Sequence, residues 1–311
     1  MVTLVTGAGG FIGSALCTAM QKAERKVRPA FRSASRTAYF PDSVVAPGLG
    51  KESCWYSALQ GVDVVVHIAG VSSTDARGAS DALHEFRMVN VEGTAKLARQ
   101  AAALGVRRFI FVSSIKVHGE STALGCSFKS DDVAAPLDAY GISKVETELE
   151  LRKIAKEYGM ELTIIRPPAV YGPGMRGNLA TLVRWIDRGF PIPLGAITDN
   201  RRSFVSIDNL VSLLIRCLDH PLAANQAFLV SDGEDLSTAD FIKRVAKAMN
   251  RRPLLISFPC VILELFLTIF GLASIMQRLR GSLQIDMTKT CVLLDWAPPL
   301  SVDQALDRMV I

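Results

Sequence analysis

Hydrophobic and polar positions in the first half of the chain follow two alternating patterns. Short apolar runs rich in β-branched residues predict strands over 2–6, 26–32, 63–69, 108–113 and 162–165. Between these runs, apolar residues recur at helical spacing over 11–23, 82–104 and 140–158. Strands that are apolar on both faces and alternate with helices form parallel sheets covered on both sides. We therefore expect an α/β domain with a doubly wound parallel sheet.

The alternation weakens from about residue 170. Glycine and proline residues spread over 172–195 predict loops there. We expect the first domain to span 1–170 and a smaller C-terminal region to span 171–311, with parts of it returning to the sheet. The elements expected in this second region are a strand over 203–206 and helices over 208–218 and 238–249.

A strongly apolar segment covers 254–276 and contains one charge, Glu264, and one proline, Pro259. Its length approaches the roughly 20 residues that span a bilayer, but a carboxylate near its centre is unfavourable in lipid. We interpret the segment as a helix buried in the smaller region. Peripheral contact with a membrane is the alternative, and we do not expect a span.

Composition narrows the class of protein. Apolar residues make up 49% and charged residues 21% of the chain, as in a packed globular protein. The net charge of +5 is spread along the sequence, which favours an enzyme with anionic ligands and not a nucleic-acid-binding protein. The six cysteines form no C-x-x-C pair and the four histidines are isolated, so we expect reduced, mostly buried thiols and no metal. Met1 leads directly into a strand pattern, so we expect a cytoplasmic protein without a signal peptide.

A glycine-rich turn, T-G-A-G-G-F-I-G at 6–13, links the first strand to the first helix. Glycine is needed where the backbone turns sharply and approaches a pyrophosphate closely, and the following helix N-terminus offers free N–H groups. The strand–turn–helix context predicts a dinucleotide site.

The end of the second predicted strand bears on the cofactor. An NAD enzyme usually places an acid there to hold the ribose hydroxyls, but this chain has Arg32, Ser33 and Arg36 and no acid. A guanidinium suits a 2′-phosphate because it can form two parallel hydrogen bonds with it. We expect NADP(H) as the preferred cofactor, with NAD(H) as the alternative.

Tyr140 and Lys144 lie four residues apart on a predicted helix and therefore on one face of it. A phenol with an ordinary pKa near 10 exchanges protons poorly at neutral pH, and a nearby ammonium favours its anion. Ser113 and Ser114 follow the fourth predicted strand, at the carboxyl edge where such sheets bind ligands. We expect Ser114, Tyr140 and Lys144 to form the catalytic centre.

These motifs resemble the extended short-chain dehydrogenase/reductase family, in its NAD(P)-dependent nucleotide-sugar epimerase/dehydratase group. The resemblance covers essentially the whole chain and implies a Rossmann fold. After the glycine turn, the matching motifs are V-V-H-I-A-G at 65–70, N-V-E-G-T at 90–94, V-S-S-I-K-V-H-G at 112–119, Y-G-I-S-K at 140–144, R-P-P-A-V-Y-G-P-G at 166–174 and D-W-A-P at 295–298.

The resemblance implies roles for matching positions. Ser114 would hydrogen-bond the reacting sugar oxygen, Tyr140 would transfer the proton, and Lys144 would bind the nicotinamide ribose. A UDP-sugar substrate and a homodimer are also implied. The implied cofactor-binding residues, beyond the catalytic pair and the residues at the second strand, are Gly7, Gly10, Phe11, Ile12, Gly13, Ala69, Gly70, Asn90, Ser113 and Pro167. The implied substrate-binding residues are Ser114, Lys116, Asn178, Leu179, Arg202 and Arg278, with Arg280 competing with Arg278.

Departures from the family pattern exclude one reaction. Related 4,6-dehydratases place Asp-Glu directly after the active-site hydroxyl, where this chain has Ile115 and Lys116. A lysine cannot act as the carboxylate base, so we do not expect dehydration. His118 replaces a tyrosine and Ala169 replaces an asparagine that are frequent in the family.

Three functions remain. The first is a 4-keto reductase that uses NADPH on a UDP-4-keto-6-deoxy-hexosamine, as in enzymes that make UDP-N-acetylquinovosamine for O-antigen and other lipopolysaccharide-type surface polysaccharides. S-S-I-K-V-H-G-E and G-S-L-Q-I-D-M-T-K resemble those enzymes most. The second is a UDP-hexose 4-epimerase with bound NAD, and the third a non-catalytic NADP-binding redox sensor. The arginines at 32 and 36 favour the reductase, and the presence of both Tyr140 and Lys144 disfavours the sensor.

Overall fold

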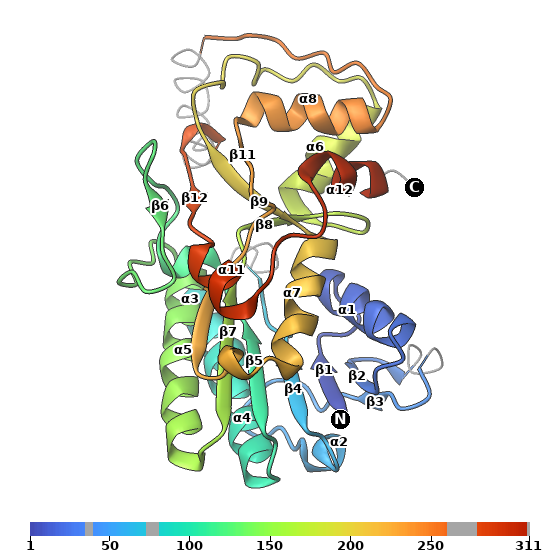
Figure 1. Cartoon of the computed structure of the whole chain (residues 1–311), viewed down its shortest axis with the longest axis vertical. Coiled ribbons are helices and arrows are strands. Elements are labelled where there is room, and N and C mark those ends of the chain that lie inside the picture. Colours follow the sequence, from blue (N-terminus) through green and yellow to red (C-terminus); the bar gives the residue numbers. More distant parts are fainter. Residues whose placement is uncertain (35–39, 73–80, 260–278, 310–311) are drawn as a thin grey trace.

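Seven strands form the central sheet of the computed structural model, which describes residues 1–34, 40–72, 81–259 and 279–309 (Figure 1). All neighbouring strands in this sheet pair in parallel. In spatial order they are β10 (Gln226–Leu229), β7 (Glu161–Arg166), β5 (Arg108–Val112), β4 (Val64–His67), β1 (Thr3–Thr6), β2 (Val27–Phe31) and β3 (Val44–Val45).

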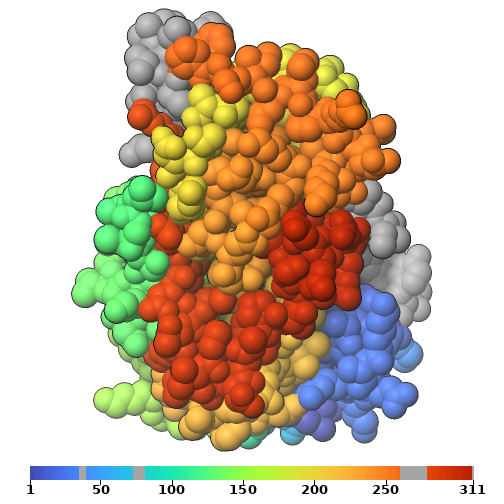
Figure 2. All heavy atoms as spheres, turned by 45° about the horizontal axis from the view of Figure 1, so that its top comes forward, coloured from blue at the N-terminus to red at the C-terminus, as the bar shows by residue number. Residues whose placement is uncertain are grey.

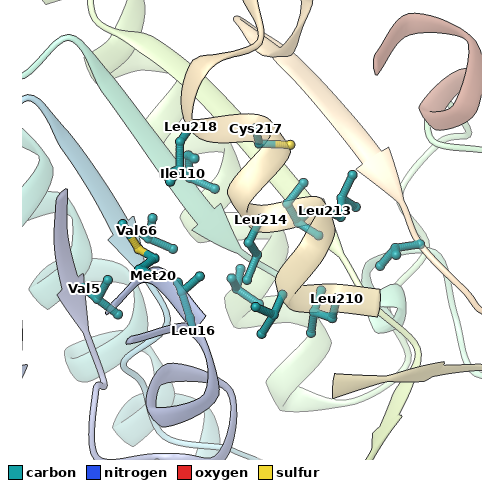
Figure 3. Close-up of a cluster of buried hydrophobic side chains, with 14 of the residues drawn as sticks. Val5, Leu16, Met20, Val66, Ile110, Leu210, Leu213, Leu214, Cys217 and Leu218 are labelled. Atoms are coloured by element: carbon teal, nitrogen blue, oxygen red, sulfur yellow. The ribbon is translucent and has the colours of Figure 1, made fainter. Parts of the chain in front are cut away.

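Alternate side chains of the strands pack into two hydrophobic clusters, one on each face of the sheet. Val5, Val66 and Ile110 face α1 (Phe11–Lys22) and α7 (Ile207–Asp219) (Figure 3). Their sequence neighbours, Leu4 and Val65 among them, point to the opposite face. There they pack with α2 (Tyr56–Leu59), α4 (Thr94–Ala103) and α5 (Ala139–Tyr158). Strands buried on both faces explain the continuous apolar runs in the sequence.

The helix expected over 82–104 is interrupted. It consists of α3 (Ala82–Phe86), a wide π-helical turn η2 (Arg87–Gly93) and α4. The wide turn contains Asn90, whose side chain is held by hydrogen bonds to two other elements. Such turns are frequent at functional sites.

The chain returns to the sheet after leaving it. β8 (Ala169–Tyr171), β9 (Arg202–Ser206) and β11 (Asp235–Leu236) form a separate small sheet above the main one. α7 and β10 lie between β9 and β11 in the sequence, yet they pack on the main sheet. The rest of the smaller region contains α6 (Gly177–Asp187), α8 (Thr238–Ala248), α12 (Val302–Met309) and a third hydrophobic cluster.

One expectation for the smaller region is wrong, and a second fails over the residues that the structure describes. Residues 177–187 form the helix α6, although glycines and prolines predicted loops, because Leu179, Leu182, Val183 and Ile186 make a helical apolar face that packs into the third cluster. The described start of the apolar segment, 254–259, forms no helix. It is extended, with Leu255 paired to Ile192. The rest of that segment, 260–276, lies outside the described residues. Within the described ranges, no helix has the length and apolar character needed to cross a bilayer.

The cysteines are less buried than expected. Cys17 and Cys217 are buried, whereas Cys54 and Cys126 are exposed and Cys291 is half-buried, all as free thiols. Cys260 lies outside the described residues. The exposed pair occupies loop positions, where no packed neighbour excludes water.

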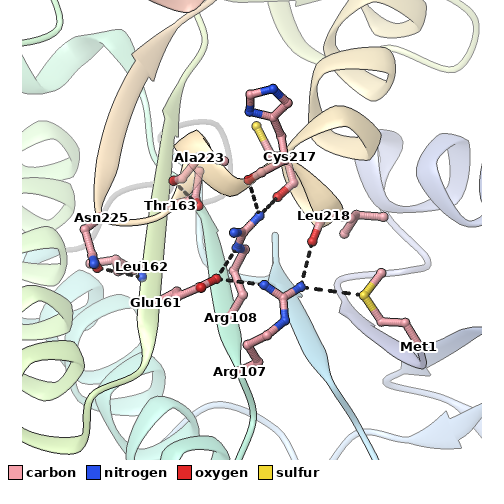
Figure 4. A network of polar contacts seen from close by, with 11 residues as sticks. Met1, Arg107, Arg108, Glu161, Leu162, Thr163, Cys217, Leu218, Ala223 and Asn225 are labelled. Carbon is pink, nitrogen blue, oxygen red and sulfur yellow. Dashed lines mark hydrogen bonds and ion pairs between the residues drawn. The ribbon is translucent and has the colours of Figure 1, made fainter. Parts of the chain in front are cut away.

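A polar network closes the amino-terminal edge of the main sheet (Figure 4). The buried guanidinium of Arg108 pairs with Glu161 at 2.7 Å and donates to the carbonyl oxygens of Cys217 and His220. These bonds attach the end of α7 to β5 and β7. At the opposite, carboxyl edge, β6 (Ser127–Phe128) pairs with β12 (Gln284–Ile285), and α11 (Thr288–Leu294) comes next in the chain. The C-terminal segments are red in Figure 2 and lie on the face of the molecule where the smaller region borders the main domain.

Candidate active site

The carboxyl ends of β1, β4, β5 and β7 meet at one edge of the sheet, below the smaller region. The chain runs from β1 to β2 on one side and places β4 on the other. Ligands of open α/β sheets bind at such a change of direction, outside the carboxyl ends of the strands. The glycine turn, Ser114 and the Tyr140 helix all lie at this edge.

The glycine turn leaves no room for side chains. Gly7 has a φ of +71°, and a Cβ atom on it would lie 2.8 Å from the backbone nitrogen of Ala69. A Cβ atom on Gly13 would lie 2.2 Å from the carbonyl oxygen of Gly7. Gly10 is the N-cap of α1, and its N–H donates to the Gly7 carbonyl at 2.9 Å. This bare turn opening a helix fits the pyrophosphate of a dinucleotide.

Tyr140 and Lys144 occupy the first turns of α5. Asp138 caps this helix by accepting from the backbone N–H of Gly141 at 2.7 Å. The Lys144 Nζ atom lies 5.6 Å from the centroid of the Tyr140 ring and donates to the carbonyl oxygen of Val112 at 3.1 Å. The structure therefore confirms that the two side chains share one face and that they lie at the end of β5.

Burial lowers the pKa of Lys144 to about 8, although the charge of Glu148 acts in the opposite direction. The group is therefore protonated at neutral pH. A protonated ammonium beside a phenol favours the phenolate, which is the form that accepts a proton. The edge of the Phe86 ring packs against Tyr140, with the ring centroids 5.8 Å apart.

Ser114 and Ser113 point in different directions. The Ser114 hydroxyl, half-buried, accepts from the backbone N–H of Lys116 at 3.3 Å and caps the short helix η3 (Ile115–Val117). The Ser113 hydroxyl is buried and donates to Glu148 at 2.6 Å. The backbone N–H of Ile115 donates to the Pro167 carbonyl at 2.9 Å, which joins this loop to the end of β7.

Asn90 joins the loop after β4 to the catalytic helix. Its side chain accepts from the N–H of Val71 at 2.9 Å, and donates to the Val71 carbonyl at 3.1 Å and to the Ser143 hydroxyl at 3.3 Å. A Cβ atom on Gly70 would lie 2.8 Å from the Asn90 Oδ1 atom. Asn90 thus links the backbone at Val71, in the expected cofactor site, to the helix that carries Tyr140.

The residues expected to select the cofactor are partly described. Arg32 and Ser33 directly follow β2 and are exposed, so they are open to a ligand at this edge. Arg36 lies outside the described residues. Phe11 and Ile12, at the start of α1, pack partly against the hydrophobic cluster on their side of the sheet.

The residues expected to bind substrate are spread over the smaller region. The Arg202 guanidinium, at the start of β9, donates to the Gly281 carbonyl at 2.7 Å, directly after Arg280. Arg278 lies outside the described residues. Asn178 is exposed on the first turn of α6, whereas Leu179 packs partly into the third hydrophobic cluster.

Lys116 is held by two acids, Glu120 at 2.8 Å and Asp138. The position that carries an acid in related dehydratases is therefore a lysine paired with the cap of the Tyr140 helix.

Sequence reasoning missed Phe111, whose ring lies under the Lys144 ammonium, and Glu148, which accepts from Ser113. A signal for Glu148 was present, because it lies four residues after Lys144 on the same helix face. Nothing in the sequence pattern indicated Phe111.

Comparisons with known proteins identify the family of the chain. Residues 3–231 match the NAD dependent epimerase/dehydratase family. A UDP-glucose 4-epimerase of Vibrio cholerae is 42% identical over 308 residues, which cover 98% of this chain and 93% of that protein. A dTDP-4-dehydro-6-deoxyglucose reductase of Escherichia coli is 23% identical over 330 residues, covering 99% and 96%. The crystal structure of a UDP-glucuronic acid 4-epimerase from Bacillus cereus in complex with NAD superposes with a TM-score of 0.79 at 21% identity, covering 100% of this chain and 96% of that one.

The fold and the family match define a short-chain dehydrogenase/reductase. The chain belongs to the NAD dependent epimerase/dehydratase family. The predicted Rossmann-type fold is confirmed, and so is the predicted enzyme class, an NAD(P)-dependent nucleotide-sugar epimerase or reductase.

Proposed function

We propose that this protein is an NADP(H)-dependent reductase that acts on the C4 ketone of a UDP-4-keto-6-deoxy-N-acetylhexosamine. The product would be a UDP-N-acetylquinovosamine-type sugar for O-antigen or another surface polysaccharide. The observation that carries the proposal is that Lys144 lies beside Tyr140 and donates to the carbonyl of Val112, two residues before Ser114, at the same edge of the sheet as the glycine turn. This arrangement suits a hydride transfer coupled to a proton transfer.

Each residue of the centre has a defined task. Ser114 would donate a hydrogen bond to the C4 oxygen, and Tyr140 would deliver the proton to that oxygen as the ketone becomes a hydroxyl. Lys144, protonated below about pH 8, would stabilise the phenolate that remains. The nicotinamide, when bound, supplies the hydride.

The cofactor choice depends on the end of β2. Exposed Arg32 and Ser33 stand where NAD enzymes have an acid, and Arg36 lies three residues further on. We propose that these residues hold a 2′-phosphate and make NADP(H) the preferred cofactor. NAD(H), the dinucleotide in the Bacillus cereus structure, is the alternative.

The substrate diphosphate is assigned to Arg202, with a second arginine from the segment that begins at residue 278. Arg280 precedes Gly281, which accepts from Arg202, and this supports Arg280 over Arg278 as that second ligand. Asn178 and Leu179 at the start of α6 would lie near the diphosphate and base.

A UDP-hexose 4-epimerase is the second candidate, favoured by the 42% identical relative from Vibrio cholerae. One experiment separates the two. The purified protein is given UDP-glucose or UDP-N-acetylglucosamine without added cofactor, and separately UDP-4-keto-6-deoxy-N-acetylglucosamine with NADPH, and the sugars are identified by NMR. Epimerised hexose in the first reaction with no reduction in the second would replace our proposal by the epimerase.

We also propose that the protein is a cytoplasmic homodimer that touches the membrane peripherally through the segment beginning at residue 254. The Ile192 N–H donates to the Leu254 carbonyl at 2.8 Å and the Ile256 N–H donates to the Ile192 carbonyl at 2.9 Å, which places this segment beside 190–195. Leu255 packs inward. Because side chains alternate along an extended chain, Leu254, Ile256 and Phe258 point outward and are exposed by 54%, 43% and 39%. Sedimentation equilibrium tests the dimer.

The neighbouring surface carries exposed positive charge at Arg184, Arg188 and Arg252, which suits anionic lipid headgroups. Ile256→Ser with Phe258→Ser should reduce co-sedimentation with phosphatidylglycerol vesicles. Leu222→Ser, at another exposed apolar position, three residues after the end of α7, is the control. Equal binding of both variants would remove this contact from the proposal.

A further inference from the structure

A buried ion pair lies behind the catalytic centre. The Glu148 and Arg166 side chains are 6% and 8% exposed, and among the ion pairs of the described residues only this one has both partners so deeply buried. Arg166 donates through Nε to Oε1 at 3.0 Å and through Nη2 to Oε2 at 2.5 Å. Removing two charges from water is unfavourable unless the pair is well hydrogen-bonded. Apolar side chains at the same two positions would stabilise the fold equally well, so stability alone does not account for the ion pair.

The pair connects the three elements that carry the site. Glu148 lies on α5, Arg166 ends β7, and the Ser113 hydroxyl at the end of β5 donates to the same Oε1 atom at 2.6 Å. Arg166 also contacts the His118 Nε2 atom at 2.9 Å and donates to the Ser130 carbonyl at 2.7 Å. Burial, together with the charge of Arg166, lowers the pKa of His118 to about 4, so His118 is neutral and accepts this bond.

Glu148 also stands one helical turn from Lys144. Its charge raises the pKa of that ammonium against the lowering effect of burial. The other titratable groups near Lys144 are Tyr140 on the same helix, Arg166 behind Glu148, and His67 from β4. Burial and the charge of Lys144 lower the pKa of His67 to about 3, so it is neutral. Lys116, on η3, is paired with Asp138 and Glu120.

We propose that Glu148 is a positioning residue of the catalytic centre, which anchors Ser113 so that Ser114 faces the substrate and places a carboxylate one helical turn from the Lys144 ammonium. The inference rests on the proposed function for its catalytic consequences. Its effect on the titration of Lys144 does not depend on the substrate.

Glu148→Gln separates the two contributions. Glutamine keeps an oxygen for Ser113 but removes the charge, which leaves Arg166 as an uncompensated cation near Lys144. Both changes lower the proton affinity of Lys144, so the alkaline fall in kcat should move to lower pH by about one unit. The KM for the UDP-sugar should change little, because the substituted residue is remote from the diphosphate.

Glu161→Gln is the matched control. It removes a carboxylate from another buried arginine, Arg108, at the opposite edge of the sheet (Figure 4). We expect both variants to lower stability, but Glu161→Gln should leave the pH profile of kcat unchanged. Glu148→Asp keeps the charge and should restore the alkaline limb to its wild-type position.

The titration is also measured without substrate, from urea unfolding across pH 6–10. The pH dependence of the free energy of unfolding that is lost in Lys144→Met is due to the titration of Lys144. In Glu148→Gln this dependence should begin at a pH about one unit lower than in the wild type. If the wild type reduces no UDP-sugar but this unfolding shift is present, the proposed function fails and the role of Glu148 stands. If both readouts match the Glu161→Gln control, the ion pair is only structural and the inference is overturned.

Ser113→Ala keeps the inference testable should Glu148→Gln fail to fold. It removes one hydrogen bond and leaves the ion pair intact. We expect kcat to fall roughly tenfold through misplacement of Ser114, with no shift of the alkaline limb. Unchanged kcat would overturn the anchoring role.

Discussion

The Lys144 ammonium lies over the ring of Phe111, 4.6 Å from its centroid. The ring and the Val112 carbonyl hold the charge inside the protein, where burial lowers the pKa of Lys144 from 10.5 to about 8. At pH values between about 8 and 10.5, the unfolded chain binds more protons than the folded chain. The free energy of unfolding should therefore rise with pH from about 8 to 10.5, and the penalty is fully present below pH 8.

Lys144→Met should consequently stabilise the protein at neutral pH while abolishing turnover. The depressed pKa corresponds to roughly 3 kcal/mol, an upper bound because the bond to Val112 is lost as well. Urea unfolding at pH 7 and pH 9.5, without added nucleotide, measures the effect. A methionine variant that unfolds at lower urea than the wild type at pH 7 would contradict this account.

Tyr140→Phe should lose turnover and keep nucleotide affinity, because only the proton-transferring hydroxyl is removed. Loss of general acid–base catalysis lowers kcat by about 10²- to 10⁴-fold. Tyr158→Phe, at the exposed end of the same helix, is the control and should behave as the wild type. Retained activity in the Tyr140 variant would remove the phenol from the mechanism.

Gly13→Ala should abolish cofactor binding, since its Cβ atom would meet the Gly7 carbonyl at 2.2 Å and push the turn open. Overpacking of this kind also lowers stability by about 1–3 kcal/mol. At Gly50 a Cβ atom would meet its nearest neighbour only at 3.9 Å, so Gly50→Ala is the matched control. Fluorescence titration with NADPH compares the two variants, and equal affinity would show that the turn is not the dinucleotide site.

Arg32→Asp should weaken NADPH relative to NADH by at least about tenfold, or 1.4 kcal/mol, because it replaces a phosphate-binding cation with an acid that suits ribose hydroxyls. Arg152→Asp, an exposed reversal of charge on α5, controls for net charge. The cofactor assignment is wrong if the wild type already prefers NADH.

Arg202→Ala should raise KM strongly, with a smaller fall in kcat, because the guanidinium is assigned to the diphosphate and not to C4. Calorimetry with UDP compares this variant with Arg201→Ala, whose exposed guanidinium donates to the Thr198 and Asn200 carbonyls. If the Arg202 variant binds UDP as tightly as the wild type, Arg202 does not bind the diphosphate and has only a structural role at β9.

Much of the main domain could be predicted because its signals are local. Apolar runs indicated the buried strands, and the four-residue spacing placed Tyr140 and Lys144 together. The short strand β10 was missed, since four residues, Gln226–Leu229, carry too little pattern to show that they join β7. The Glu148–Arg166 pair joins residues from different elements, and only the packing of α5 against β7 brings such partners together.

The interleaved order of the chain limits how this enzyme can change. A chain cut after Val170 would lack α7, and the face of the main sheet formed by Val5, Val66 and Ile110 would be covered by α1 alone. The smaller region therefore cannot be exchanged for another C-terminal domain. Although α7 and β10 lie beyond residue 170, α7 covers one face of the main sheet and β10 is one of its edge strands. New sugar specificity has to arise from substitutions and loop insertions made in place, and we expect the two regions to unfold together.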